Sequence, residues 1–105
     1  MDRRTIIKKK LKQFKNSVSE EIPITKMYFF GSRAKGTPNK YSDIDLIIIS
    51  PKFKNMNFFK RGALMYKHWD LNYPVDFLCY TTTTFNKLKK QESIVKQAVK
   101  EGILI

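Results

Sequence analysis

The sequence predicts a small α/β (α+β) domain in which a mixed sheet carries helices mainly on one face. Two observations lead to this fold class. Three apolar runs, at residues 24–30, 42–50 and 74–80, have the length and the β-branched or aromatic content of strands. Segments with apolar residues at helical spacing precede, separate and follow these runs. Such an order of helices and strands is typical of an α/β domain.

Length and charge restrict the kinds of protein that this chain can be. The 105 residues correspond to one domain, residues 1–105, with a single core. The chain carries 21 Lys and Arg residues against 9 Asp and Glu residues, a net charge of +12. This charge favours polyanionic partners, which are nucleotides, RNA or an acidic protein surface.

Cysteine content and hydropathy indicate the compartment. Cys79 is the only cysteine, which excludes a disulfide within the chain and fits a reducing cytoplasm, and we expect this residue in the core. No apolar run approaches the roughly 18 residues that span a bilayer, and the N-terminus is too charged for a signal peptide. We therefore expect a soluble cytoplasmic protein.

The first expected element is an amphipathic helix over residues 3–21. Its apolar residues recur at helical spacing, and lysines lie between them. We interpret the lysines as the solvated face of the helix, with contact to nucleic acid as the alternative. The apolar residues are Ile6, Ile7, Leu11, Phe14 and Val18.

The rest of the chain is expected to alternate between strands and helices. His68, the only histidine, is interpreted as a packing or capping residue near a helix end, because aspartates elsewhere already supply a base. Residues 103–105 form an apolar tail that packs on the sheet or on a partner. Besides the three strands, the sequence predicts a short helix at 33–35, loops at 37–41 and 51–57, a helix at 58–70, a helix through Phe85 and Leu88, and a helix over 94–99 that stops at Gly102.

Gly31 and Ser32 form a turn that is typical of phosphate binding. They follow the apolar run 27–30 and precede the expected short helix. A strand that ends at a glycine turn presents unpaired backbone N–H groups and a serine hydroxyl at one spot, where the positive end of a helix also points. The turn is therefore a candidate site for the phosphates of a ligand.

Asp43 and Asp45 stand at the head of an apolar strand. Side chains two apart on a strand share a face, so both carboxylates point to one site. Like charges at close range repel, and a divalent cation relieves the repulsion. Hard carboxylate oxygens suit Mg²⁺, which takes substrate phosphates as further ligands, and paired ions serve in-line displacement at phosphorus. Asp76 lies in another apolar strand, where a buried carboxylate is costly unless it pairs with a basic residue or binds metal.

Residues 31–36, Gly-Ser-Arg-Ala-Lys-Gly, and residues 42–45, Ser-Asp-Ile-Asp, resemble the signature of a known family. This is the minimal nucleotidyltransferase family, of the antitoxin type, in the DNA polymerase β-like nucleotidyltransferase superfamily. The order of the elements extends the resemblance over most of the chain. Family members usually have arginine where this chain has Lys35, and lysine keeps the charge but loses the bidentate geometry. The third acidic residue of the family falls on the following strand, which favours metal binding for Asp76.

The resemblance implies a nucleotidyltransferase fold and a defined reaction. An acceptor hydroxyl attacks the α-phosphorus of a nucleoside triphosphate, most simply ATP, and pyrophosphate leaves. Two Mg²⁺ ions are implied, and Asp43, Asp45 and Asp76 are implied as both metal ligands and catalytic residues, with Asp76 helping to deprotonate the acceptor. The glycine and serine of the turn would hold the β- and γ-phosphates, and basic side chains would offset their charge. The implied nucleotide-binding residues are Gly31, Ser32, Arg33, Lys35 and Ser42.

The resemblance also implies a partner. Larger relatives carry an additional helical domain that grips the base and the acceptor, and we expect a partner to supply that surface here. Similar proteins are typically encoded beside HEPN-domain proteins, which are small helical ribonuclease-like toxins, and some silence the toxin by adding AMP to a tyrosine. Two alternatives stay open. One is an antitoxin that acts by binding only, which the intact aspartates disfavour. The other is an enzyme acting on RNA ends, which only the basic charge supports.

Overall fold

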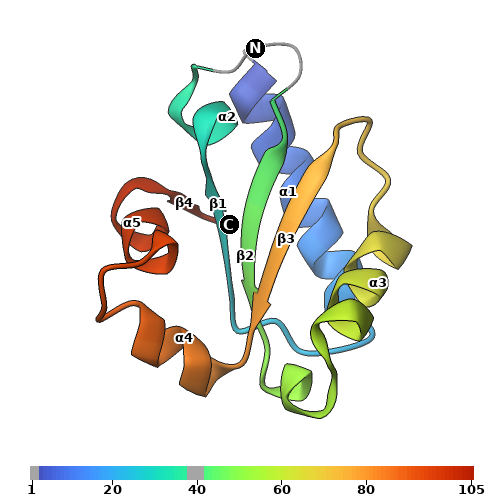
Figure 1. Ribbon diagram of the computed structural model, residues 1–105. Coiled ribbons are helices and arrows are strands. Elements are labelled where there is room, and N and C mark those ends of the chain that lie inside the picture. Colours follow the sequence, from blue (N-terminus) through green and yellow to red (C-terminus); the bar gives the residue numbers. More distant parts are fainter. Residues whose placement is uncertain (1–2, 38–41) are drawn as a thin grey trace.

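The computed structural model describes residues 3–37 and 42–105 of the chain. In these residues four strands form one sheet in the order β3-β2-β1-β4, with helices packed around it (Figure 1). The strands are β1 (Lys26–Phe30), β2 (Ile44–Ile49), β3 (Val75–Tyr80) and β4 (Ile103–Leu104). The helices are α1 (Arg3–Ser19), α2 (Ser32–Lys35), the 3-10 helix η1 (Pro51–Asn55), α3 (Phe58–His68), α4 (Thr82–Leu88) and α5 (Ile94–Glu101).

The strand directions bring three chain segments to one end of the sheet. β1 runs antiparallel to β2 and to β4, whereas β2 and β3 are parallel. The sheet is therefore mixed, as the sequence predicted. The C-terminal end of β1 lies beside the N-terminal ends of β2 and β3. The Gly-Ser turn that follows β1 and the aspartates that open β2 and β3 consequently meet at this end.

The longer helices, α1 and α3, cover one face of the sheet and form the larger apolar cluster. Phe14 of α1 stacks on Phe77 with the ring centres 5.8 Å apart, and it meets Trp69 edge-on at 5.1 Å. Burial of such rings removes a large apolar area from water, which is the main favourable contribution to folding. The fully covered strand residues on this face are Met27, Phe29, Ile44, Leu46, Ile48, Val75 and Cys79.

The shorter helices α4 and α5 form a smaller cluster on the opposite face. Phe85 of α4 stacks on Tyr28 of β1 with the ring centres 5.9 Å apart. Val95 and Ala98 of α5 are buried there, beside Ile47 of β2. The helices thus lie mainly on the α1/α3 face, as predicted, and this smaller second layer completes the core.

Some element boundaries differ from those that the sequence predicted. β1 and β2 begin two residues later than expected, so Ser42 and Asp43 precede β2. Residues 51–55 form η1 instead of a loop, because the Ser50 side chain accepts a hydrogen bond from the Lys52 N–H and Pro51 starts the turn. The predicted loop at 37–41 lies outside the described residues except for Thr37.

The apolar tail and the cysteine have the roles that the sequence predicted. The tail packs on the sheet: β4 pairs with β1, and the Ile105 N–H donates to the Met27 carbonyl at 2.9 Å. Cys79 is buried, and burial raises the pKa of its thiol to about 12. In the described part of the chain, no helix has both the length and the apolar character needed to cross a membrane.

His68 is a packing residue, as interpreted from the sequence. Its Nδ1 lies 2.8 Å from the Ser17 hydroxyl, and its Nε2 lies 3.1 Å from a Glu21 carboxylate oxygen. Both partners belong to α1 or the turn after it, so the histidine ties the end of α3 to the end of α1. Its contacts are with this helix pair and not with the aspartates.

Candidate active site

The turn after β1 has a backbone conformation that glycine adopts readily and other residues do not. Gly31 has φ 82° and ψ −168°, which lies outside the regions open to residues with a Cβ. The four-residue helix α2 starts directly after it at Ser32. It ends at Gly36, whose left-handed φ of 83° lets its N–H donate to the Ser32 carbonyl. Two glycines therefore fix the entrance and the exit of α2.

Gly31 also allows the chain to pass close to Asp45. Phe30 lies opposite Asp45 in the antiparallel β1–β2 pair, which places Gly31 next to the Asp45 carboxylate. A Cβ added at Gly31 would overlap Asp45 Oδ2 and would lie 3.1 Å from Asp45 Cγ. The missing side chain thus brings the backbone of the predicted phosphate turn against one of the predicted carboxylates.

The aspartates of neighbouring strands lie side by side. Asp45 and Asp76 are register partners in the parallel β2–β3 pair, so their side chains share a face. Asp43 precedes β2 by one residue. Asp45 is half-buried, whereas Asp43 and Asp76 are exposed. The expectation of a buried carboxylate at Asp76 is therefore wrong, because this residue sits near the open start of β3. Its connection to the site comes from its register with Asp45.

The neighbouring carboxylates and partial burial raise the pKa of Asp45. Loss of hydration is the largest cause, followed by the charge of Asp76 and then that of Asp43. All three effects disfavour the ionised form. Among the ion pairs of the described residues, none involves these aspartates. The cluster therefore lacks, within the described chain, the basic partner that would stabilise its charge.

Arg33 is buried and joins the segments around the site. Its Nε donates to the Ser42 carbonyl at 2.7 Å, and its guanidinium carbon lies 4.7 Å from the centre of the Tyr73 ring. These contacts connect α2 to the residue before Asp43 and to the segment that leads into β3. Ser42 is half-buried in this position. The arginine thus holds the chain segments around the site in place.

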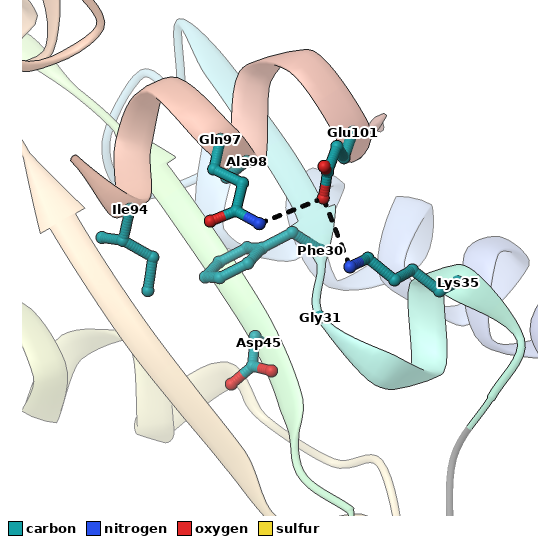
Figure 2. Close-up of a pocket in the computed structure, with 8 residues that line it drawn as sticks. All are labelled: Phe30, Gly31, Lys35, Asp45, Ile94, Gln97, Ala98 and Glu101. Carbon is teal, nitrogen blue, oxygen red and sulfur yellow. Dashed lines mark hydrogen bonds and ion pairs between the residues drawn. The ribbon is translucent and has the colours of Figure 1, made fainter. Parts of the chain in front are cut away.

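Lys35 is paired with a residue that sequence reasoning did not select. Its Nζ lies 3.3 Å from Glu101 Oε2, and the Gln97 side-chain amide donates to the same oxygen at 3.3 Å (Figure 2). The hydrogen bond from Lys35, followed by that from Gln97, lowers the pKa of Glu101. Because the side chains of Lys35 and Glu101 are largely exposed, the pair contributes little to stability. Loss of this ion pair would therefore cost little stability, so Lys35 can bind another anion instead.

A pocket of about 270 Å³ lies between the Gly31 turn and α5. In Figure 2, Asp45 lies beneath Phe30, with Ile94 of α5 on one side and Lys35 of α2 on the other. The pocket therefore has an apolar wall, a carboxylate and a cation within one space. Its lining residues are Phe30, Gly31, Lys35, Asp45, Ile94, Gln97, Ala98 and Glu101.

The donor set of this site suits a hard divalent cation. Within the described ranges, no three Asp, Glu, His or Cys side chains are arranged so that they could jointly hold one ion. Mg²⁺ does not require such a cage, since it commonly takes one or two carboxylates and completes its shell with water and substrate phosphates. Asp45 and Asp76, adjacent in register and mutually repelling, provide such a pair.

Comparison with known proteins identifies the family. The sequence matches the model described as a nucleotidyltransferase domain over residues 11–105. The chain belongs to this family. "Probable protein adenylyltransferase MntA" of Haemophilus influenzae is 34% identical over 87 residues, which is 79% of this chain and 75% of that protein. A crystal structure of a candidate nucleotidyltransferase from Sulfolobus solfataricus matches with a TM-score of 0.67 at 25% identity, covering 96% of this chain and 80% of that one.

Family membership confirms both the resemblance and the fold class that the sequence predicted. The chain is a nucleotidyltransferase, an enzyme that transfers a nucleoside monophosphate from a nucleoside triphosphate. The match begins within α1 and extends to the last residue, so it includes every strand and the pocket.

Sequence reasoning missed the contribution of α5. Gln97 and Glu101 are four residues apart and therefore lie on one helix face, which is the signal that the sequence offers. That spacing does not predict which end of the sheet lies next to this face of α5. The answer depends on the folded chain, in which α5 packs against β1 and its Glu101 reaches Lys35 beside the Gly31 turn.

Asp45→Asn is expected to stabilise the protein near neutral pH when no metal is added. Because the pKa of Asp45 in the folded protein is above its ordinary value of 3.8, the folded protein keeps a proton that the unfolded chain releases as the pH rises. Ionisation of Asp45 therefore lowers the free energy of unfolding, and this loss is complete above the folded-state pKa. Urea unfolding in EDTA should show the variant at least as stable as the wild type at neutral pH, with the advantage disappearing below pH 3.8.

Asp70→Asn is the matched control, since Asp70 is an exposed aspartate that follows α3. It should not reproduce the pH-dependent gain. If Asp45→Asn is less stable than the wild type at neutral pH, the Asp45 carboxylate makes favourable contacts that outweigh its repulsion by the other aspartates.

Proposed function

We propose that this enzyme transfers AMP from ATP to a protein hydroxyl, a tyrosine of a HEPN-type toxin, and so acts as the antitoxin of a toxin–antitoxin pair. The name of the Haemophilus influenzae relative supports a protein acceptor and an adenylyl group. The resemblance of residues 31–45 to antitoxin-type nucleotidyltransferases supports the toxin partner. The observation that carries the proposal is the strand register, which places Asp45 beside Asp76 and against Gly31. The single buried Cys79 supports a cytoplasmic location.

The Gly31 turn and α2 would bind the triphosphate. The first N–H groups of a helix have no partner within that helix, so those that open α2 can donate to phosphate oxygens. The Ser32 hydroxyl stands at the same point and can add a hydrogen bond. Lys35 would leave Glu101 for the phosphates, which carry more charge than one carboxylate. Arg33 and Ser42 would act mainly by fixing this segment.

Asp43, Asp45 and Asp76 would hold two Mg²⁺ ions together with the phosphates. When bound, such ions neutralise charge on the phosphates and orient the reacting oxygens. The fit rests on the chemistry of the donors, since burial and the charges of Asp76 and Asp43 raise the pKa of Asp45. None of the three carboxylates takes part in an ion pair of the described residues. Mg²⁺ would remove this repulsion and the repulsion between the carboxylates and the triphosphate.

The aspartates would also orient the acceptor. The oxygen of the acceptor hydroxyl forms a bond to the α-phosphorus while the bond from that phosphorus to the bridging oxygen breaks, and pyrophosphate departs. Asp76 is exposed at the edge of the cluster, where it can accept the hydroxyl proton. Most of the rate enhancement would come from holding the reacting groups in line and offsetting their charge.

Asp43→Asn and Asp45→Asn are each expected to abolish nucleotidyl transfer while leaving the protein folded. Each change removes a ligand to the metal ions and relieves repulsion in their absence. The assay incubates the protein, Mg²⁺ and α-labelled nucleoside triphosphates with the product of the neighbouring gene, and separately with single-stranded RNA. Label is expected on the protein acceptor, with ATP as the donor.

Asp70→Asn controls for a general effect of removing a negative charge. Transfer within a few-fold of the wild type in either site variant would contradict the assignment of these aspartates. Label on RNA ends, with none on protein, would replace the proposed acceptor, whereas a tight protein complex without transfer would indicate an antitoxin that acts by binding only.

Ser32→Ala is expected to weaken the binding of Mg²⁺-ATP. A hydrogen bond from the serine hydroxyl to a charged phosphate oxygen contributes about 1.5–3 kcal/mol. Isothermal titration calorimetry should show this loss for Ser32→Ala, and EDTA should remove binding by the wild type. Ser19→Ala, which changes a hydroxyl that donates to the Lys15 carbonyl within α1, is the control. Equal affinity of Ser32→Ala and the wild type would place the phosphates away from this turn.

A further inference from the structure

Helix α3 presents an apolar stripe to solvent. Phe59 and Tyr66 are exposed by 83% and 56%, and Ala63 between them is also exposed. Together with Gly62 these residues follow the spacing i, i+3, i+4 and i+7, so they lie on one side of the helix. We call this side, made of Phe59, Gly62, Ala63 and Tyr66, the α3 face. A soluble protein rarely leaves two large aromatic rings exposed on one helix stripe without a use for them.

The glycine in the α3 face has no role within the described chain. Glycine is less favourable than every residue except proline in the interior of a helix. Gly62 has no positive φ, and a Cβ added to it would meet nothing within 4 Å. Neither the backbone nor the packing of the described residues therefore requires glycine here. A partner helix that approaches the backbone closely would require it, because small residues let two helices come together.

Two side chains of α3, one of them Tyr66 of the α3 face itself, tie the helix to the sheet. The Tyr66 hydroxyl donates to the Val75 carbonyl at 3.0 Å, and Arg61 Nη1 donates to the Cys79 carbonyl at 3.0 Å. Both acceptors belong to β3, the edge strand, so α3 protects this edge from pairing with another chain. In Figure 1, α3 lies beside β3 at this side of the molecule. A partner on the α3 face would thus lie next to the strand whose second residue is Asp76.

The charges around the α3 face favour an acidic partner. No residue from Phe58 to His68 is acidic, and exposed Lys60 and Lys67, seven residues apart, lie along one side of the apolar stripe. Lys67 pairs with Glu21, with Nζ 2.8 Å from the carboxylate oxygen. A second copy of this chain would bring the same lysines and a net charge of +12 of its own, which opposes self-association through this face.

The rings of α3 are poorly arranged for RNA. Single-stranded nucleic acid binds through successive aromatic faces on which bases stack. Arg61 lies over the Phe58 ring with its guanidinium carbon 4.9 Å from the ring centre, and Tyr66 packs edge-on against Phe77 at 4.9 Å. Among the described residues no ring or cation is stacked on Phe59, so Phe59 is the ring of α3 that has no such contact. A single unstacked ring, Phe59, beside the open backbone at Gly62 suits a packed helix better than a series of stacked bases.

We propose that the α3 face docks an acidic amphipathic helix of the protein that presents the acceptor hydroxyl. The apolar side of that helix would pack over Gly62 and Ala63 between Phe59 and Tyr66, and acidic residues along one of its edges would meet Lys60 and Lys67. Docking there would hold the acceptor protein beside β3, the strand that carries Asp76. This inference rests on the proposed transfer to a protein, and it adds the surface that selects the acceptor.

The test measures the affinity for the purified product of the neighbouring gene, and transfer of label to it, for the full-length variants Gly62→Ala and Phe59→Ser. Gly62→Ala fills space that is open in the isolated protein and improves helix propensity, so it should melt at the same or a higher temperature than the wild type. Both variants should bind the acceptor at least about tenfold more weakly, as expected for changes at the centre of an interface. Binding of Mg²⁺-ATP should be unchanged in both.

Matched controls lie on α1. Asn16→Ala improves helix propensity at an exposed position, and Ile6→Ser removes an apolar side chain that is 39% exposed. Both should bind and modify the acceptor as the wild type does. Lys60→Glu should slow association with the acceptor and reduce its dependence on salt.

Acceptor binding and transfer at wild-type levels in Gly62→Ala and Phe59→Ser would overturn the inference while leaving the proposed function intact. Sedimentation that shows a wild-type dimer, which Phe59→Ser dissociates, would assign the face to a second copy instead. Loss of single-stranded RNA binding in Phe59→Ser, with acceptor binding kept, would assign it to RNA. Failure of the wild type to bind or modify the neighbouring protein would overturn both the inference and the protein acceptor.

Discussion

Repulsion among the carboxylates at one end of the sheet is the constraint on which the site depends. The apolar residues Ile44, Leu46 and Ile48 occupy the α1/α3 core, and this fixes which face of β2 is buried there. Since side chains alternate along a strand, Asp45 must point to the other face, beside its register partner Asp76. A slip of one residue would bury the carboxylate in the core. Packing of the core thus keeps Asp45 and Asp76 close together although their negative charges repel. A substrate that brings a cation would reduce this repulsion.

The elements around the aspartates form the pocket beside them. Gly31 allows the turn that is proposed to bind phosphate to pass close to Asp45, and Arg33 holds α2 against the segments before β2 and β3. On the face opposite the main core, α5 closes one side of the pocket, and its Glu101 forms an ion pair with Lys35. This weak, exposed pair is a contact that a triphosphate can replace without disturbing the fold. The arrangement therefore combines a rigid carboxylate pair with an exchangeable cation.

The sequence predicted those features that depend on local pattern and not those that depend on how distant segments meet. Apolar runs identified the three main strands, and the spacing of Gly31 and Asp45 pointed to two segments that the structure brings together. The exposure of Asp76 could not be foreseen, because Val-Asp-Phe-Leu reads as buried until the start of β3 is known to lie at an open end. The partner of Lys35 was equally hidden, since Glu101 is distant in sequence and reaches it only through the return of α5. Family membership, in contrast, followed from the motif alone and is confirmed.

The central claim is that the register of β2 and β3 creates a metal–triphosphate site against the Gly31 turn. A crystal structure with Mn²⁺ and a non-hydrolysable ATP analogue tests it most directly, because the anomalous signal of manganese locates each ion independently of the protein. The account predicts manganese bound by Asp45 and Asp76, with the triphosphate on the N–H groups of α2 and Lys35 released from Glu101. Manganese bound only at other carboxylates, with the analogue away from Gly31, would contradict it.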